Sequence, residues 1–126
     1  MAALEEKQRI LCVDDDLILA ELCEEGLRTL DYEVIGVADA EKALQLFEES
    51  PEDFDLLIVD QIMPKVTGTA LAKRALTIRP DIDVMLVTGH NGAVSEEEAR
   101  IIGVKEVLMK PLTITELEAA IKRALA

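Results

Sequence analysis

Four groups of polar residues each follow a short apolar segment, and together they contain the side chains needed for phosphoryl chemistry. The groups are, in chain order, Asp14 to Asp16, Asp60, Thr88 with Gly89, and Lys110 with Pro111. A carboxylate can attack phosphorus and form an acyl phosphate. A hydroxyl and an ammonium can stabilise the phosphoryl oxygens by position and charge. If these groups meet in space, the sequence predicts a site that handles a phosphoryl group.

The carboxylates of this set also predict a metal. Asp14, Asp15 and Asp60 would repel one another if they lay close together, and each would raise the pKa of the others. A hard divalent cation among them removes this repulsion. Mg²⁺ fits best, since it accepts one or two carboxylates, keeps several waters and completes its octahedron with phosphate oxygens. We therefore expect Mg²⁺ as the cofactor.

Each residue has a simpler interpretation when it is taken alone. An aspartate after a strand commonly caps the next helix, and a lysine before proline is commonly a solvated loop charge. Asp16 suits the cap of a first helix as well as it suits a metal site. What favours a site is the coincidence of carboxylates, a hydroxyl and an ammonium at the ends of several strands.

The segments that must position these residues are five apolar runs, each continuous and rich in β-branched side chains. They are Ile10 to Val13, Val34 to Val37, Leu56 to Val59, Val84 to Val87 and Val107 to Met109. Such runs are typical of strands buried on both faces. Helical periodicity separates them, most clearly in the last segment, where one stripe holds Ile114, Leu117, Ile121 and Leu125.

Strands that alternate with helices predict an α/β fold, with a doubly wound parallel sheet and five helices on its two faces. Helix starts are marked by two capping boxes, Thr113 with Glu116 and Ser95 with Glu98, and Gly103 marks a helix end. Ligands of such folds bind beyond the carboxyl ends of the strands. The four polar groups lie at those ends.

Length and charge limit the classes of protein to consider. A chain of 126 residues suits one domain, and we expect a disordered tail over residues 1–7 and the domain over residues 8–126. The net charge of −13 repels a phosphate backbone, which argues against direct binding of nucleic acid. The sequence contains neither a leader pattern nor a membrane-spanning apolar run, so we expect a cytoplasmic protein without membrane insertion.

The chain contains two cysteines, Cys12 and Cys23. One lies in an apolar run and the other in a helical pattern, without the close spacing of a metal knuckle or a redox motif. We interpret both as buried thiols, and a reactive role is the alternative.

Taken together, the motifs resemble the receiver domains of bacterial two-component response regulators, the chemotaxis-regulator-like superfamily. The matching residues are Asp14-Asp15, Asp60-Gln61-Ile62-Met63-Pro64 with Gly68, Thr88-Gly89, and Lys110-Pro111. The resemblance covers residues 8 to 125. It implies a flavodoxin-like sheet of five parallel strands in the order 2-1-3-4-5.

Carried over by position, the resemblance implies a role for each motif residue. Asp60 is the expected phosphoacceptor, and Thr88 and Lys110 would contact the phosphoryl group. The expected metal ligands are carboxylates and one backbone carbonyl, from Asp14, Asp15, Asp60 and Ile62.

Three further residues flank the expected phosphoryl position. Gly89 would leave room beside the phosphate, although a tight turn explains it nearly as well. Pro111 follows a cis peptide bond in this family, which would aim Lys110 into the site. His90 would orient water or shield the site, and a solvent-exposed loop residue is the simpler interpretation.

The resemblance also implies partners. His90 is the only histidine, so we expect the donor to be a separate histidine kinase, a histidine phosphotransfer domain or a kinase of which this chain is one module. Phosphorylation is expected to switch the conformation and control a downstream effector protein, with homodimerisation as an added option. The domain would catalyse only its own phosphotransfer and autodephosphorylation. The segment from Thr88 to Leu117 most resembles the receivers of hybrid sensor kinases.

Two positions depart from the usual family pattern. Val107 occupies the place in the last strand where receivers often carry a switching Tyr or Phe, and a small aliphatic side chain cannot make the same rotamer change. Apolar Ile62, beside the acceptor, cannot orient water by hydrogen bonding. We therefore expect a moderately long-lived phosphoryl form.

Other functions on similar folds fit less well. The Asp14-x-Asp16 pattern occurs in phosphohydrolases of the haloacid-dehalogenase type, but this chain is short and lacks their later acidic pair. A flavin or nucleotide carrier would need a glycine-rich phosphate loop, and none follows a predicted strand. The strongest alternative is a receiver-like scaffold that binds a partner without being phosphorylated.

Overall fold

A computed structural model describes residues 8–89, 94–110 and 112–125. Within these ranges it contains five strands, five α-helices and a short 3-10 helix. In chain order they are β1 (Arg9–Val13), α1 (Leu17–Arg28), β2 (Glu33–Val37), α2 (Ala40–Glu49), the 3-10 helix η2 (Pro51–Asp53), β3 (Leu56–Asp60), α3 (Gly68–Ile78), β4 (Asp83–Thr88), α4 (Glu96–Ile102), β5 (Glu106–Met109) and α5 (Ile114–Leu125). The predicted alternation is confirmed, and the tail expected over residues 1–7 lies outside the described ranges.

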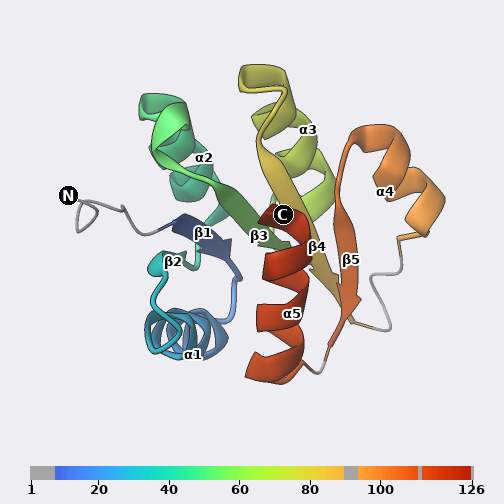
Figure 1. Ribbon diagram of the computed structural model, residues 1–126. Coiled ribbons are helices and arrows are strands. Elements are labelled where there is room, and N and C mark those ends of the chain that lie inside the picture. The colour runs from blue at the N-terminus through green and yellow to red at the C-terminus, as the bar shows by residue number, and fades with distance from the viewer. Residues whose placement is uncertain (1–7, 90–93, 111, 126) are drawn as a thin grey trace.

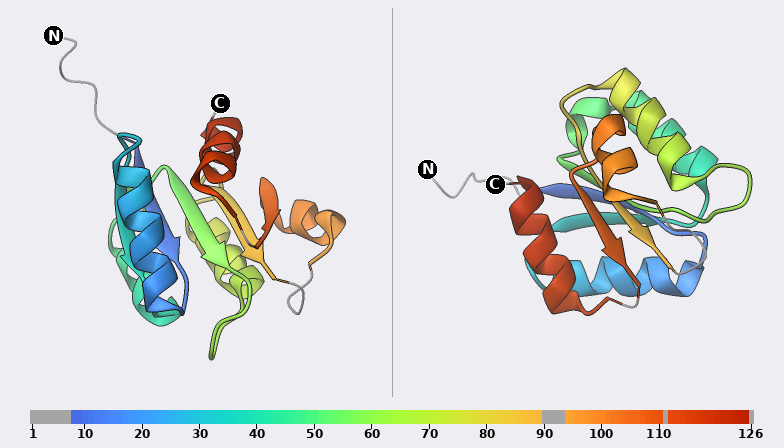
Figure 2. Two further views of the ribbon diagram at one scale, coloured as in Figure 1. Left: turned by 90° about the horizontal axis from the view of Figure 1, so that it is seen from below. Right: turned by 90° about the vertical axis from the view of Figure 1, so that its right-hand side faces the viewer.

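All the strands form one parallel sheet in the order β2-β1-β3-β4-β5. This confirms the topology implied by the family resemblance. Helices α1 and α5 cover one face of the sheet, and α2, α3 and α4 cover the other (Figures 1 and 2). The chain winds outward from β1 to β2 and then in the opposite direction from β3 onward. The carboxyl ends of β1 and β3 therefore form the switch point where such folds bind ligands.

Strand β1 divides its side chains between the two faces, because successive strand residues point to opposite sides. Leu11 and Val13 belong to the core cluster under α2, α3 and α4, whereas Ile10 and Cys12 belong to the cluster under α1 and α5. None of the four is more than 3% exposed. Each large apolar side chain buried in this way contributes roughly 1.5–3 kcal/mol. Burial on both faces accounts for the continuous apolar run in the sequence.

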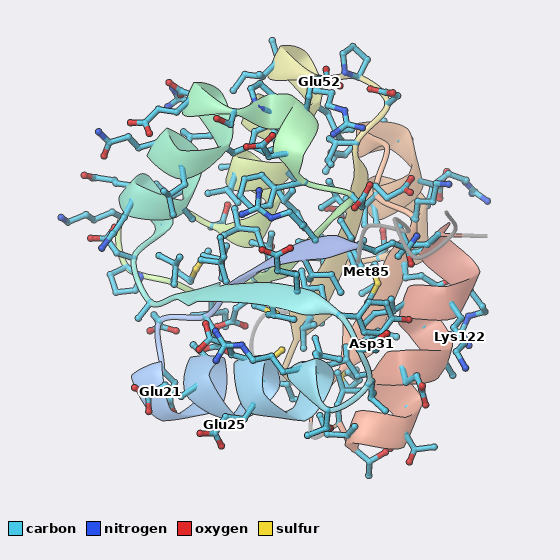
Figure 3. The ribbon with its side chains drawn as sticks, turned by 60° about the vertical axis from the view of Figure 1, so that its left-hand side comes forward. Glu21, Glu25, Asp31, Glu52, Met85 and Lys122 are labelled. Carbon is cyan, nitrogen blue, oxygen red and sulfur yellow. The ribbon has the colours of Figure 1, made fainter. Side chains whose placement is uncertain are left out.

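The covering helices are apolar toward the sheet and charged toward solvent. Met85 of β4 is fully buried in the cluster beneath α1 and α5 (Figure 3). Glu21 and Glu25 on α1 and Lys122 on α5 extend away from the sheet in the same view. Among the helices of the described ranges, none has both the length and the apolar composition that crossing a bilayer requires.

The predicted helix signals are confirmed as hydrogen bonds. The Glu116 amide donates to Thr113 Oγ1 at 3.1 Å, and the Thr113 amide donates back to Glu116 Oε1 at 3.4 Å. The Glu98 amide donates to Ser95 Oγ at 3.0 Å at the start of α4. Gly103 ends α4 with a φ of 110°, a left-handed conformation that glycine adopts without steric cost.

The apolar stripe predicted for the last helix faces the sheet except at its first residue. Leu117 is 6% exposed and Ile121 is fully buried, while Ile114 is 39% exposed. A Cβ atom at position 26 would collide with the end of the Ile114 side chain, so Gly26 in the last turn of α1 makes room for it. Helices α1 and α5 therefore pack closely at this point.

Candidate functional site

Parallel pairing brings the carboxyl ends of four strands to one edge of the sheet. Asp60 ends β3 and Thr88 ends β4, while Asp14 and Lys110 directly follow β1 and β5. These strands are parallel and adjacent in the order β1-β3-β4-β5, so all four residues lie along the same edge. The convergence predicted from the strand ends is present.

Three of the carboxylates at this edge form a cluster. One oxygen each from Asp14, Asp15 and Asp60 lies within 4.8 Å of the other two. Asp15 is exposed, Asp14 is partly buried and Asp60 is only 7% exposed. Two oxygens on opposite sides of a small divalent cation lie about 4 Å apart, because each bond is roughly 2.1 Å. The cluster can therefore hold such a cation after small side-chain movements.

Lys110 supplies positive charge to this cluster. Its Nζ donates to Asp14 Oδ2 at 2.9 Å and lies 3.4 Å from Asp60 Oδ1. The Lys110 backbone is fixed as well, since its amide donates to the Thr88 carbonyl at 2.8 Å. The ammonium thus contacts two carboxylates that come from different strands.

The pKa of Asp60 is raised from its ordinary value to about 6. Burial is the main cause, because it disfavours the charged carboxylate, and the negative charge of Asp14 adds to it. Lys110 acts in the opposite direction but does not offset both effects. Burial also works against the charge of Lys110, yet its hydrogen bond to Asp14 and the charges of Asp14 and Asp60 raise the pKa of this ammonium. The cluster accordingly lacks positive charge, which a bound cation would provide.

The backbone after Asp60 is held against the start of α3. The Gly68 amide donates to the Gln61 carbonyl at 2.9 Å, and the Thr69 amide donates to Gln61 Oε1 at 2.9 Å. A Cβ atom at position 68 would lie 2.5 Å from the Asp60 carbonyl oxygen. The sequence motif contains both Gly68 and Gln61, but it predicts no structural role for either residue. The structure shows that both fix the position of the acceptor strand.

Thr88 and Gly89 lie at the end of β4. Thr88 is 2% exposed, and its Oγ1 donates to the Gly89 carbonyl at 3.2 Å. A Cβ atom at position 89 would meet nothing within 4 Å. Packing among the described residues therefore does not require a glycine there, and its role beside a phosphate stays a prediction.

The remaining predicted residues differ in how much the structure says about them. Ile62 is 49% exposed beside the cluster, and the role of its carbonyl stays a prediction. Val107 is partly buried against the core cluster that includes α2 and α3 residues. His90 and Pro111 lie outside the described residues, so their predicted roles and the cis bond stay predictions.

Asp16 lies directly before α1, in the N-cap position. Its carbonyl accepts a hydrogen bond from the Ala20 amide at 3.0 Å, as the cap residue of a helix does. Its own amide donates to Asp14 Oδ1 at 3.0 Å, which helps to orient that carboxylate. Asp16 is not part of the three-carboxylate cluster.

A large cavity adjoins the acidic cluster on the α1 and α5 face of the sheet. Its volume is about 980 Å³, and Asp60 and Lys110 belong to its lining together with Cys12, Cys23 and Leu117. This cavity could not be predicted from the sequence, because it arises from the packing of two helices that lie far apart in the chain.

Comparison with known proteins agrees with this geometry. The family model of the response regulator receiver domain matches residues 10–122. The chain belongs to this family. The receiver domain protein from Clostridium thermocellum superposes with a TM-score of 0.89 at 29% identity, over 94% of each chain. A CheY-like receiver domain protein from Methanospirillum hungatei JF-1 superposes with a TM-score of 0.84 at 32% identity, over 95% of this chain and 94% of its own.

Curated relatives of this receiver domain are longer proteins. The "Probable transcriptional regulator ycf27" of Porphyridium aerugineum is 32% identical over 120 residues, which are 95% of this chain and 49% of the relative. The chain spans about half the length of this relative and of its counterparts in Cyanophora paradoxa and Guillardia theta. These relatives are named as regulators, so the expected resemblance to hybrid-kinase receivers gains no support from them. The chain is therefore a receiver domain with an acidic pocket formed by Asp14, Asp15 and Asp60.

Proposed function

We propose that this receiver accepts a phosphoryl group on a carboxylate oxygen of Asp60, from the phosphohistidine of a histidine kinase or of a histidine phosphotransfer domain. The main support for this proposal is the position of Asp60. Its carboxylate shares a cluster with Asp14 and Asp15 and lies 3.4 Å from the Lys110 ammonium. A carboxylate between a cation site and an ammonium can attack phosphorus where the phosphoryl charge is neutralised.

Mg²⁺ is the cation that we propose for the acidic cluster. Asp14, Asp15 and Asp60 would hold it through carboxylate oxygens, and Ile62 through its backbone carbonyl. The raised pKa of Asp60 supports this proposal. It shows that the positive charge of Lys110 does not offset the burial of Asp60 and the negative charge of Asp14. When bound, the metal supplies positive charge to the phosphoryl oxygens.

In the transfer step, an Asp60 oxygen forms a bond to phosphorus while the bond from phosphorus to the donor imidazole nitrogen breaks. The electron pair of the broken bond stays on the imidazole. Lys110 neutralises charge on the phosphoryl oxygens, and the Thr88 hydroxyl donates to one of them. From the family resemblance we also propose that Gly89 and His90 would border the phosphoryl group and that Pro111 would help to aim the lysine.

Phosphorylation then shifts an existing equilibrium between two conformations and so controls a downstream effector protein. Thr88 is the residue that we expect to respond first, because it is the hydroxyl next to the acceptor. Its movement would pass to the segment between β4 and α4. Val107 cannot add the aromatic rotamer change, so the hydroxyl carries the switch.

The lifetime of the acyl phosphate depends on access of water to phosphorus. Ile62 is half-exposed and apolar, so it cannot align a water molecule for attack. We propose a moderately long-lived phosphoryl form. Ile62→Asn should shorten the lifetime of the purified phosphoprotein in Mg²⁺ buffer, and rapid loss from the wild type with no change in this variant contradicts the proposal.

The proposal places this domain in the cytoplasm, where histidine kinases present their donor domains. Its reactions are limited to its own phosphotransfer and autodephosphorylation.

The net charge of −13 supports partners other than nucleic acid for this domain. Homodimerisation on phosphorylation is an added proposal, for which sedimentation of the phosphorylated and unphosphorylated domain is the test.

Intact mass after incubation with acetyl phosphate tests the proposal. The wild type should gain one phosphoryl group with Mg²⁺ and none when EDTA is added. Asp60→Asn should gain none under either condition, although it keeps the shape of the side chain. If the wild type neither gains mass nor binds beryllofluoride, the domain is an unphosphorylated scaffold.

A further inference from the structure

The two cysteines of the chain lie in contact with each other although they belong to different elements. Cys12 is in β1 and Cys23 is in α1, and their Sγ atoms are 2.8 Å apart. Both are free thiols. Cys12 faces α1 because it alternates with Leu11 and Val13, which face the opposite side of the sheet. The packing of one helix on one strand has thus paired the only two thiols in the sequence.

One of the two sulfurs can be reached from outside. Cys12 is 3% exposed, as predicted, whereas Cys23 is only partly buried. Both line the cavity of about 980 Å³ that adjoins the acidic cluster. This volume lies in the range of cavities that admit small molecules. A small oxidant can therefore approach Cys23 through the cavity, with Cys12 directly behind it.

We propose that Cys12 and Cys23 form a reversible intramolecular disulfide, so that this receiver carries a thiol modification site beside its acidic pocket. The sulfurs need to approach by less than about 1 Å, since a disulfide bond is roughly 2.05 Å long. The oxidant class is a low-molecular-weight disulfide such as oxidised glutathione. This proposal does not rest on phosphorylation of Asp60.

Oxidation of the two cysteines proceeds by two successive thiol–disulfide exchange steps. The Cys23 thiolate attacks one sulfur of oxidised glutathione, the glutathione disulfide bond breaks, and one glutathione thiolate leaves. The Cys12 thiolate then attacks Cys23 Sγ in the mixed disulfide, and the second glutathione leaves. The two protein thiols give up two electrons and two protons in total, and both glutathione molecules are reduced.

The disulfide would tie β1 to α1 across the segment that carries the acidic residues. Asp14 and Asp15 lie between the two cysteines, which are 11 positions apart. Closing a loop of this size restricts the unfolded chain, and we expect Tm to rise by roughly 5–10 °C on oxidation. The rise should disappear when dithiothreitol is added.

Mass spectrometry of the native chain tests the proposal. The folded protein is incubated with excess oxidised glutathione, remaining thiols are alkylated in acid, and the chain is cleaved with trypsin. Residues 10–28 form one tryptic peptide that contains both cysteines, because no Lys or Arg lies between Ile10 and Arg28. We expect this peptide to lose two hydrogen atoms, to retain no glutathione and to recover its mass after reduction.

Single substitutions give the matched controls. Cys12→Ser leaves the accessible thiol without its partner, so it should retain one glutathione. Cys23→Ser leaves the buried thiol, so it should stay unmodified, and neither variant should show the rise in Tm. Circular dichroism verifies that each variant is folded. If the folded wild type keeps two free thiols while the urea-unfolded chain is oxidised, or if the peptide appears only as a cross-linked dimer, the proposal is wrong.

Discussion

The Lys110 ammonium donates a hydrogen bond of 2.9 Å to the Asp14 carboxylate, although 96 positions separate the two residues in the chain. Asp14 follows β1 and Lys110 follows β5, and two further strands lie between them in the sheet. The same ammonium lies 3.4 Å from Asp60 Oδ1, at the end of one of those strands. Lys110 therefore links the carboxylate that follows β1 to the carboxylate that ends β3.

Removing this ammonium should slow phosphorylation strongly. Lys110→Gln leaves a hydrogen-bond donor but no charge, so the phosphoryl oxygens lose electrostatic stabilisation as the bond to phosphorus forms. We expect the rate with acetyl phosphate to fall by roughly tenfold to a hundredfold. The measurement is the intact mass of the protein against time. Lys110→Arg keeps the charge and should lose less, and equal rates for wild type and Lys110→Gln would remove Lys110 from the mechanism.

The raised pKa of Asp60 predicts how stability depends on pH without metal. The folded state binds the Asp60 proton more tightly than the unfolded chain, because the pKa is about 6 in the fold and 3.8 ordinarily. This proton contributes fully to stability below the pKa that Asp60 has in the unfolded chain. The contribution is lost as pH rises through the pKa that Asp60 has in the folded protein. Between about pH 4 and pH 7 we expect a loss on the order of 2 kcal/mol in the free energy of unfolding.

The variant Asp60→Asn isolates this contribution from those of the other carboxylates. It is neutral at every pH, so it should be more stable than the wild type near pH 8 in EDTA. The difference between the two proteins, measured by urea unfolding, should shrink as pH falls to about 4. A difference that does not vary with pH would mean that Asp60 has an ordinary pKa.

A divalent cation in the acidic cluster should stabilise the fold. Binding to the folded state alone adds about 1.4 kcal/mol when the metal concentration is ten times its Kd. We expect Mg²⁺ to raise Tm of the wild type at pH 8, and EDTA to reverse the rise. Asp15→Asn should lose the effect. Asp16→Asn makes the same change one position away and should keep it, so an equal rise in all three proteins would place the metal elsewhere.

Two glycines near the site should respond differently to the same substitution. Gly68→Ala places a methyl group 2.5 Å from the Asp60 carbonyl oxygen, so the start of α3 must move away from the acceptor strand. We expect a loss of roughly 1–3 kcal/mol in the free energy of unfolding, together with slower phosphorylation. Gly89→Ala meets nothing within 4 Å and should be close to neutral for stability. Equal losses in urea unfolding would contradict the close approach at position 68.

Much of the fold follows from local features of the sequence. A continuous run such as Leu56 to Val59 predicts a strand buried on both faces, and Thr113 with Glu116 forms the predicted capping box. The meeting of Asp14, Asp60 and Lys110 also follows, because the carboxyl ends of adjacent parallel strands share one edge. These predictions depend only on periodicity, capping and topology.

Side-chain contacts across elements could not be predicted in this way. The bond between Lys110 and Asp14, the contact between the two cysteines and the need for glycine at position 68 depend on how strands and helices are spaced. The degree of burial that raises the pKa of Asp60 depends on the same packing. Sequence patterns identify which residues share an edge or a face, and the packed fold decides which atoms touch.

The position of the phosphoryl group tests the central claim most directly. The protein is phosphorylated with acetyl phosphate and Mg²⁺, the acyl phosphate is reduced with borohydride, and the chain is cleaved with trypsin. Residues 43–65 form the tryptic peptide that contains Asp60, and residues 10–28 form the one that contains Asp14, Asp15 and Asp16. We predict that the reduced residue is Asp60 in the first peptide. Reduction at an aspartate of the second peptide would contradict the account and favour a nucleophile at the end of β1.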